Sequence, residues 1–143
     1  MLGMFKRKKR EAQAAVAVMT NRDLMQATVW GSFYVAAADG DIDESELKKL
    51  EKLISNTPEL KGFGAELGNT MDLAEKSFTE GGARILRQRA EKELADLAHS
   101  PEEAATVLNI MLTIADEGGI GDDEMKILEK SAKIMGLNLK DYL

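Results

Sequence analysis

The 143-residue chain contains no cysteine, one histidine and two prolines, and only 5% of its residues are aromatic. Without cysteine it cannot form disulfides, thiolate zinc sites or a cysteine nucleophile. This fits a reducing cytoplasm. No apolar run approaches the roughly 20 residues that a membrane-spanning helix needs. The start, MLGMFKRKKR, lacks the apolar segment of an export signal, so we expect no signal peptide.

Alternating strand patterns are also nearly absent, whereas helix-forming residues and helical periodicity are plain. Hydrophobic content of 44% and charged content of 31% are ordinary for a globular protein. We therefore predict an all-α fold, a single domain of six to seven helices over residues 11–143, preceded by a basic, flexible segment at 1–10. The predicted helices span 22–38, 44–55, 70–78, 83–99, 101–116 and 122–135, with a short final turn at 137–143.

Residues with known preferences mark the predicted helix ends. Thr57 and Ser100 each precede a proline and are predicted as N-caps, and Gly136 is predicted to close the helix at 122–135. Gly81-Gly82 predicts a start or a bend. The first helix, capped by Asn21 or Thr20, is predicted to bury one stripe and to place its aromatic residues in the core. The stripe is Leu24, Met25, Thr28, Val29, Phe33 and Ala36, and the aromatic residues are Trp30, Phe33 and Tyr34.

An acidic, glycine-bearing stretch occurs twice, as DGDIDESE at 39–46 and EGGIGDDE at 117–124. Between 37–52 and 115–130, eight of sixteen aligned positions are identical. Each copy lies between two predicted helices. The chain is thus predicted to contain two pseudo-symmetric hairpins, each built as helix, acidic turn and helix.

The two turns resemble the second half of a calcium-binding EF-hand loop, in which a Glu closes the loop. On that template, however, the first two ligand positions are Val35 and Ala37 in one copy and Thr113 and Ala115 in the other. Most of these side chains have no oxygen for a cation. Neither turn is therefore a complete EF-hand.

Helix capping is a simpler explanation for part of the pattern. Asp43 is placed to cap the second helix of its hairpin, with Glu46 completing a capping box. Gly40 and Gly118 would permit a positive φ, and Ile42 and Ile120 would pack under their turns. The acids at 122–124 lie in the first turn of the predicted helix, where the positive end of the helix dipole stabilises negative charge. For any single acid this explanation is as good as ligand binding.

Capping does not explain the number of acids, since one or two per turn suffice. Crowded carboxylates raise one another's pKa and destabilise the fold unless a cation offsets them. Oxygen donors without His or Cys suit calcium or magnesium better than zinc. If the two turns meet, they could share one site. The candidate divalent-metal ligands are Asp39, Asp43, Glu44, Glu46, Glu117, Asp122, Asp123 and Glu124.

Charge is distributed unevenly along the chain. Lys6, Arg7, Lys8, Lys9 and Arg10 give the first ten residues a charge of +5, so the net charge of −6 leaves −11 on the other 133 residues. An acidic body argues against nucleic acid as a partner. The basic start could contact an anionic membrane surface or a partner, or could be a solvated tail.

An enzyme is not expected. The lone histidine, His99, is predicted at a helix C-terminus, where a cation suits the dipole. Ser100 is read as a cap because no base is placed near it. The glycines at 118–121 lack the following Lys-Ser/Thr and the preceding strand of a phosphate-binding loop.

The doubled pattern A-x-[DE]-G-x-I-x-x-x-E in a helical chain of this length resembles the tellurite-resistance TerB family. The similarity runs the length of the chain. It includes the basic start and the colinear segments NRDLMQATV, SNTPELKGF, HSPEEAATVLNI and MGLNLKDY. The second turn departs from the pattern, because Glu117 stands where an Asp is expected and Gly119 and Gly121 replace Asp41 and Asp43.

The resemblance implies an all-α protein of stress resistance, in the cytoplasm or at the inner face of the membrane. It also implies divalent-metal binding through the acidic turns and work with a TerC-like integral-membrane protein and other tellurite-resistance proteins. The function predicted on this basis is a metal-binding adaptor that docks partner proteins. The alternative is a metal-independent module whose acidic face binds a basic partner.

Overall fold

The computed structural model describes residues 22–116 and 119–143, and within these ranges it is helical without strands. This confirms the predicted all-α class. The first helix, here called the central helix, occupies residues 22–36 of the described chain. It is followed by α2 (Glu44–Ser55), the 3₁₀ helix η1 (Pro58–Phe63), α3 (Ala65–Ala95), α4 (Pro101–Ala115), α5 (Asp122–Ile134) and the 3₁₀ helix η2 (Leu139–Tyr142).

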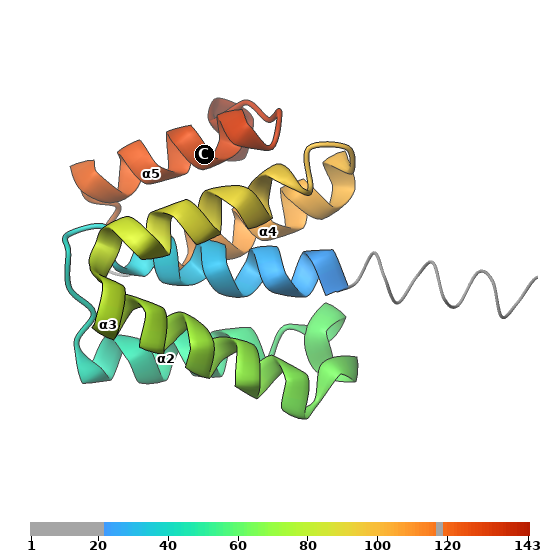
Figure 1. Cartoon of the computed structure of the whole chain (residues 1–143). Helices are drawn as coiled ribbons and strands as arrows, with labels where there is room; N and C mark the ends of the chain where they lie inside the picture. The colour runs from blue at the N-terminus through green and yellow to red at the C-terminus, as the bar shows by residue number, and fades with distance from the viewer. Residues whose placement is uncertain (1–21, 117–118) are drawn as a thin grey trace, which may run out of the picture.

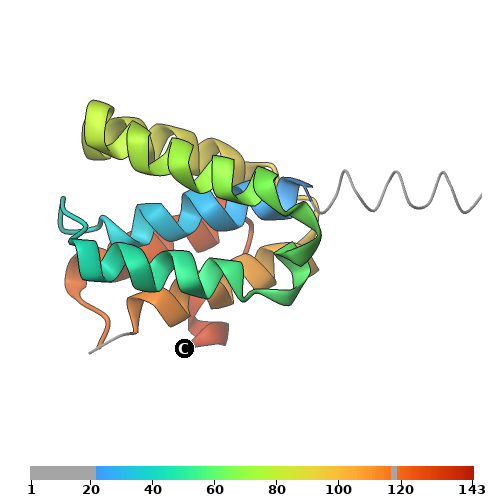
Figure 2. The same ribbon diagram turned by 90° about the horizontal axis from the view of Figure 1, so that it is seen from below.

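The central helix lies between the other helices in two perpendicular views (Figures 1 and 2). The predicted stripe is buried except for Ala36, which is half-buried. Residues off the stripe, including Ala27, Ser32 and Val35, are fully buried as well, because neighbours pack on several faces of this helix. The three aromatic residues predicted for the core, Trp30, Phe33 and Tyr34, are all buried.

Gly31 is where the central helix meets its neighbours most closely. A Cβ at Gly31 would lie 3.0 Å from Sδ of Met111 in α4 and 3.2 Å from Cδ2 of Leu94 in α3. A hydrogen in place of a side chain therefore lets α3 and α4 press onto the same turn of the central helix. This packing holds the α4–α5 hairpin close to the first hairpin.

Helix α3 differs from the prediction at its start and agrees at its middle. It begins at Ala65, five residues before the predicted start near 70, because the chain turns at Gly64 with a φ of 53° and η1 leads directly into the helix. Gly82, with φ 74° and ψ −173°, interrupts it and confirms the predicted bend. The chain changes direction there, so the second half of α3 runs back over the bundle (Figure 1).

Thr57 and Ser100 occupy the predicted N-cap positions of η1 and α4, but neither side chain makes the capping hydrogen bond. The Thr57 hydroxyl donates to the carbonyl of Leu53 at 3.1 Å and makes no cap for η1. Ser100 does not cap α4 through its side chain, because its hydroxyl bonds to the Glu103 carboxylate. The predicted closure at Gly136 is confirmed: its φ is 75°, and the N–H of Leu137 donates to the carbonyl of Ala132 at 2.8 Å.

The candidate caps Thr20 and Asn21 and the basic segment from Lys6 to Arg10 lie outside the described residues. Among the helices that are described, none combines the length and apolar character needed to cross a bilayer.

Candidate functional site: an acidic groove

The first acidic turn is built by its own carboxylates. Asp39 Oδ1 accepts from the backbone N–H of Asp41 at 3.1 Å, and Asp43 Oδ1 accepts from the N–H of Glu46 at 2.7 Å, which confirms the predicted N-cap. The Glu46 carboxylate accepts from the Asp43 backbone in return. Gly40 turns the chain with a φ of 91°, and Ile42 packs against the core as predicted.

In the second turn, fewer side chains make the hydrogen bonds that form the turn and start the next helix. Glu124 Oε1 accepts from the backbone N–H of Gly121 at 3.0 Å, while Gly121 has no side chain to cap α5. Gly118 and Glu117 lie outside the described residues, and the positive φ observed in this turn, 97°, belongs to Gly119. Ile120 packs against the core as predicted. Among the described residues, capping thus occupies Asp43, Glu46 and Glu124, whereas Asp39 bonds only within its turn and Asp122 and Asp123 make no capping hydrogen bond.

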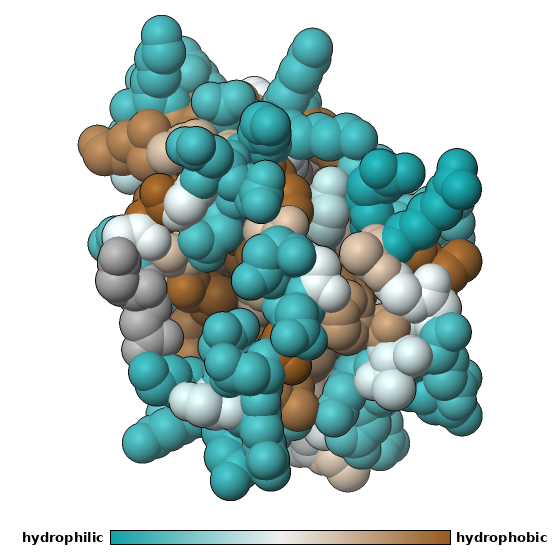
Figure 3. All heavy atoms as spheres, turned by 90° about the vertical axis from the view of Figure 1, so that its left-hand side faces the viewer, coloured by the Kyte–Doolittle hydropathy of each residue, from teal (hydrophilic) through white to brown (hydrophobic). Residues whose placement is uncertain are grey.

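The two turns, some 78 positions apart in the sequence, line one groove with a volume of about 870 Å³. Its acidic lining residues are Asp39, Glu46, Asp116, Asp122, Asp123 and Glu124. Asp43 and Glu44, two of the predicted ligands, are not in the lining. Figure 1 shows the first turn, the start of α2 and the start of α5 at the same end of the bundle. That end, seen face-on in Figure 3, is covered largely by hydrophilic side chains, with hydrophobic atoms visible in the hollows between them.

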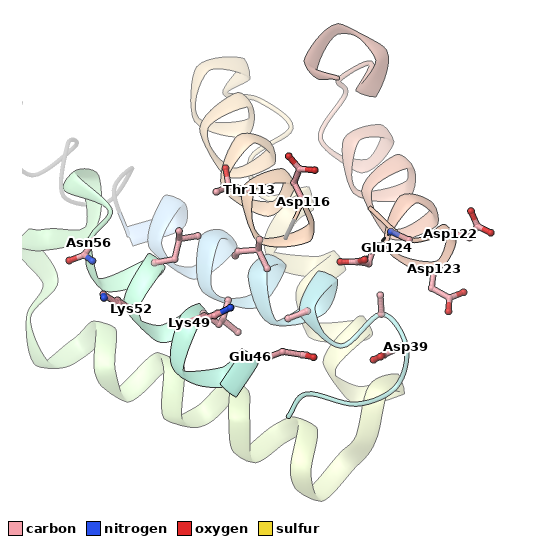
Figure 4. Close-up of a pocket in the computed structure, with 16 residues that line it drawn as sticks. Asp39, Glu46, Lys49, Lys52, Asn56, Thr113, Asp116, Asp122, Asp123 and Glu124 are labelled. Atoms are coloured by element: carbon pink, nitrogen blue, oxygen red, sulfur yellow. Dashed lines mark hydrogen bonds between the residues drawn. The ribbon is translucent and has the colours of Figure 1, made fainter. Parts of the chain in front are cut away.

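The carboxylates do not all face the groove. In Figure 4 the side chains of Asp39 and Glu46 extend toward one another, and Glu124 points into the space between α5 and the first turn. Asp122 and Asp123 project away from it at the start of α5. The inner acids are therefore Asp39 and Glu46 from the first hairpin and Glu124 from the second.

Desolvation and the neighbouring carboxylates together shift the pKa of Glu46. Its pKa is raised above the ordinary value, first by desolvation, then by the charge of Asp43 and a hydrogen bond with that side chain, and then by the charge of Asp39. The N–H of Asp43, donating to Glu46, acts in the opposite direction and lowers the pKa. Negative charge at this position is thus unfavourable unless something positive offsets it.

As they lie, these carboxylates do not form a complete metal site. Within residues 22–116 and 119–143, no three or more Asp, Glu or His side chains are grouped closely enough to hold an ion. The donor chemistry, carboxylate oxygen alone, suits a hard cation. A bound ion would need rotation of side chains toward the groove, or a contribution from Glu117, which lies outside the described ranges.

The other end of the groove was not predicted as part of the site. There Lys49, Lys52 and Asn56 line one wall, opposite the acidic end (Figure 4), and Leu50, Leu53 and Ile114 form an apolar floor. The sequence contains a pattern from which this wall could have been predicted. Positions 46, 49, 50, 53 and 56 follow helical spacing, so Glu46 marks the start of a stripe along α2. The groove is thus acidic at one end, basic at the other and apolar beneath.

A family model described as tellurite resistance protein TerB matches residues 25–143 of this chain. The chain belongs to the TerB family. The matched region contains the central helix almost entirely, both hairpins and every described residue of the groove. Neither the comparison with curated proteins nor the comparison with solved structures gave a match. The acidic groove is therefore a feature that this TerB-family chain builds within the family's matched region.

Proposed function

We propose that this TerB-family chain acts in tellurite resistance and stress response as a divalent-metal-binding adaptor, with the acidic groove as its binding surface. The observation that carries the proposal is that both acidic turns line one groove. Six carboxylates line this groove, more than the capping of α2 and α5 uses. The oxygen donors closest to the groove are those of Asp39, Glu46 and Glu124, with Asp116, Asp122 and Asp123 around them.

A divalent cation would neutralise the negative charge of these carboxylates. Calcium and magnesium suit the donor set better than zinc, because neither nitrogen nor sulfur donors line the acidic end. Of the other predicted ligands, Asp43 is engaged as the cap of α2 and Glu44 adds charge at the same helix start. Glu117 is adjacent in sequence to Asp116, which lines the groove.

The adaptor role rests on the shape and lining of the groove beyond its acidic end. An apolar floor bounded by lysines and an asparagine is suited to a peptide segment with apolar and charged side chains. A TerC-like integral-membrane protein and other tellurite-resistance proteins are the proposed partners. The basic residues Lys6 to Arg10 would support contact with the inner face of the membrane, from the cytoplasm.

A second candidate function is a metal-independent interaction module, in which a basic segment of the partner neutralises the acids directly. It is favoured by the absence of a preassembled ligand cluster in the described part of the chain. The two functions differ in what neutralises the negative charge of the groove, which is a metal ion in the first and a basic segment of the partner in the second. They therefore differ in their response to metal ions.

Thermal unfolding with and without calcium or magnesium tests the metal-binding proposal. At ten times the dissociation constant, a bound ion should stabilise the fold by about 1.4 kcal/mol. The double variant Glu46→Gln/Glu124→Gln should lose this gain while keeping its helix starts, because an amide oxygen still accepts the N–H of Gly121. The control, Glu59→Gln/Glu129→Gln, removes the same charge from exposed residues outside the groove and should keep the gain.

An unchanged melting temperature in millimolar calcium or magnesium, together with the absence of titration heat, would exclude the metal-binding function. Binding of the proposed partner in metal-free buffer would then support the interaction module. Loss of that binding in Glu46→Gln/Glu124→Gln, but not in the control, would place the partner in the groove.

A further inference from the structure

A second pocket, of about 590 Å³, lies on the other side of the first acidic turn and has the opposite charge. Four cationic side chains line it: Arg84 and Arg87 from α3 and Lys126 and Lys130 from α5. Its remaining lining is Tyr34, Leu86, Ile127, the alanines at 37, 38 and 83, and Gly40, so no carboxylate lines it. On a chain with a net charge of −6, this is a marked local excess of positive charge.

Most of this charge is not used to hold the fold together. Lys130 pairs with Glu91, with its Nζ 2.7 Å from Oε1. By contrast, Arg84, Arg87 and Lys126 have no carboxylate within ion-pairing distance anywhere in residues 22–116 and 119–143. All four cations are exposed at the surface, and the two arginines of α3 lie at least 39 residues before the two lysines of α5 in the sequence. Mutual repulsion among them is a cost that an anion would offset.

Two further features favour an anion at this position. The second half of α3 starts after Gly82, so the positive end of its dipole lies at Ala83 and Arg84, both of which line the pocket. The exposed Ala83 and the half-buried Ala38 and Ile127 provide an apolar surface for an uncharged part of a ligand. The volume lies within the range of small-molecule sites, roughly 300–1,000 Å³.

We infer that this basic pocket binds a phosphate group, either as free phosphate or carried by a small organic phosphate. Two arginines at one site suit a dianion with several acceptor oxygens, because each guanidinium offers a planar set of donors. The two lysines add point charge. Binding should be weak and salt-sensitive, because the cations are exposed. The inference is independent of metal binding in the acidic groove.

The test is a titration of the full ¹⁵N-labelled chain, freed of divalent ions with a chelating resin, by inorganic phosphate at pH 7.5. Sodium chloride is exchanged for phosphate so that ionic strength stays constant. Saturable shifts are expected for the amides of Gly40, Ala83 and Lys126 and for the side-chain Nε–H of Arg84 and Arg87. Shifts that are absent, or that rise without saturation across the whole surface, overturn the inference.

Matched variants separate a specific site from general attraction. Arg87→Gln/Lys126→Gln should weaken phosphate binding at least tenfold. The control, Lys76→Gln/Lys140→Gln, removes two exposed cations outside the pocket and should change binding by less than twofold. Equal weakening in both variants contradicts the inference. Circular dichroism of each variant confirms that the helices are intact.

Phenyl phosphate distinguishes the two sources of the group. Tighter binding than inorganic phosphate, with added shifts at Ala38 and Ile127, identifies an organic phosphate that also uses the apolar surface. Equal affinity identifies phosphate alone. Binding of phenyl phosphate that persists in Arg87→Gln/Lys126→Gln would show that the ring, and not the phosphate, is recognised, and would overturn the inference.

Discussion

The hydroxyl of Tyr34 donates a hydrogen bond to Oε1 of Glu91 at 3.0 Å. Lys130 Nζ lies 2.7 Å from the same oxygen, so one carboxylate joins the central helix, α3 and α5. Tyr34 is buried, and its pKa is raised above the ordinary value by desolvation and by the hydrogen bond and charge of Glu91, with Arg87 acting against them. This contact ties the first hairpin to the second beside the basic pocket.

Removing this hydroxyl should destabilise the fold. Tyr34→Phe leaves Glu91 with one donor fewer, and we expect the free energy of unfolding to fall by about 1–2 kcal/mol. Urea unfolding followed by circular dichroism measures the change. The matched control is Tyr142→Phe, because Tyr142 is the other tyrosine of the chain and makes no such hydrogen bond among the described residues. Equal losses in the two variants would contradict the assigned role.

The same contact predicts a response to alkaline pH. A folded-state pKa raised above the unfolded value means that Tyr34 contributes stability below about pH 10, and that this contribution is lost as the pH rises further. The difference in phenolate absorbance between the wild-type chain and Tyr34→Phe reports Tyr34 alone. We expect its ionisation above pH 10; ionisation at or below pH 10 would show that the hydroxyl is not held by Glu91.

Asp43 should contribute to stability as a helix cap and not through its charge in the groove. Asp43→Ala removes the acceptor for the N–H of Glu46, and loss of an N-cap costs about 1 kcal/mol. Asp43→Asn keeps an acceptor oxygen and should recover most of that loss. Thermal unfolding of the two variants separates capping from charge. Equal destabilisation by Ala and Asn would mean that the charge of Asp43, and not its acceptor oxygen, stabilises the fold.

Glu46 should behave in the opposite way, because its charge is unfavourable in the metal-free protein. A raised folded-state pKa means that stability is lost as the pH rises through the ordinary glutamate range near 4.5. Glu46→Gln should therefore stabilise the metal-free chain at pH 7, by at most about 0.5 kcal/mol because the residue is exposed. The gain should vanish at pH 3 and shrink in high salt, whereas Glu129→Gln should show none. A destabilised Glu46→Gln at pH 7 would contradict this electrostatic account.

Local features of the fold were predictable from the sequence because they depend on neighbouring residues. Helical periodicity, the Asp43 cap, the Gly82 bend and the Gly136 closure are all encoded within a few positions. Ser100 shows the limit of such reasoning. A serine before a proline usually caps, yet its hydroxyl is drawn to Glu103, whose own pKa is raised by burial and by Asp23 from the central helix. That competition depends on packing between helices.

The site was predictable only in part, for the same reason. The doubled acidic turns were visible in the sequence, but their convergence on one groove depends on how α2 and α5 pack around the central helix. Asp43 and Glu44 illustrate the consequence: they belong to the acidic stretch but do not line the groove. The basic pocket was missed altogether, because Arg84 and Lys126 come together only in the folded chain.

The most direct test of the shared groove is a calcium titration of the ¹⁵N-labelled full chain, followed at the amides of Gly40 and Gly121. These residues belong to different turns: Gly40 is next to Asp39 in the sequence, and Gly121, which lines the groove, is next to Asp122. One site lined by both turns predicts that the two amides shift together, along a single saturable curve, and that neither shifts in Glu46→Gln/Glu124→Gln. Independent curves with different midpoints, or no saturable shift at either glycine, would contradict a common cation site.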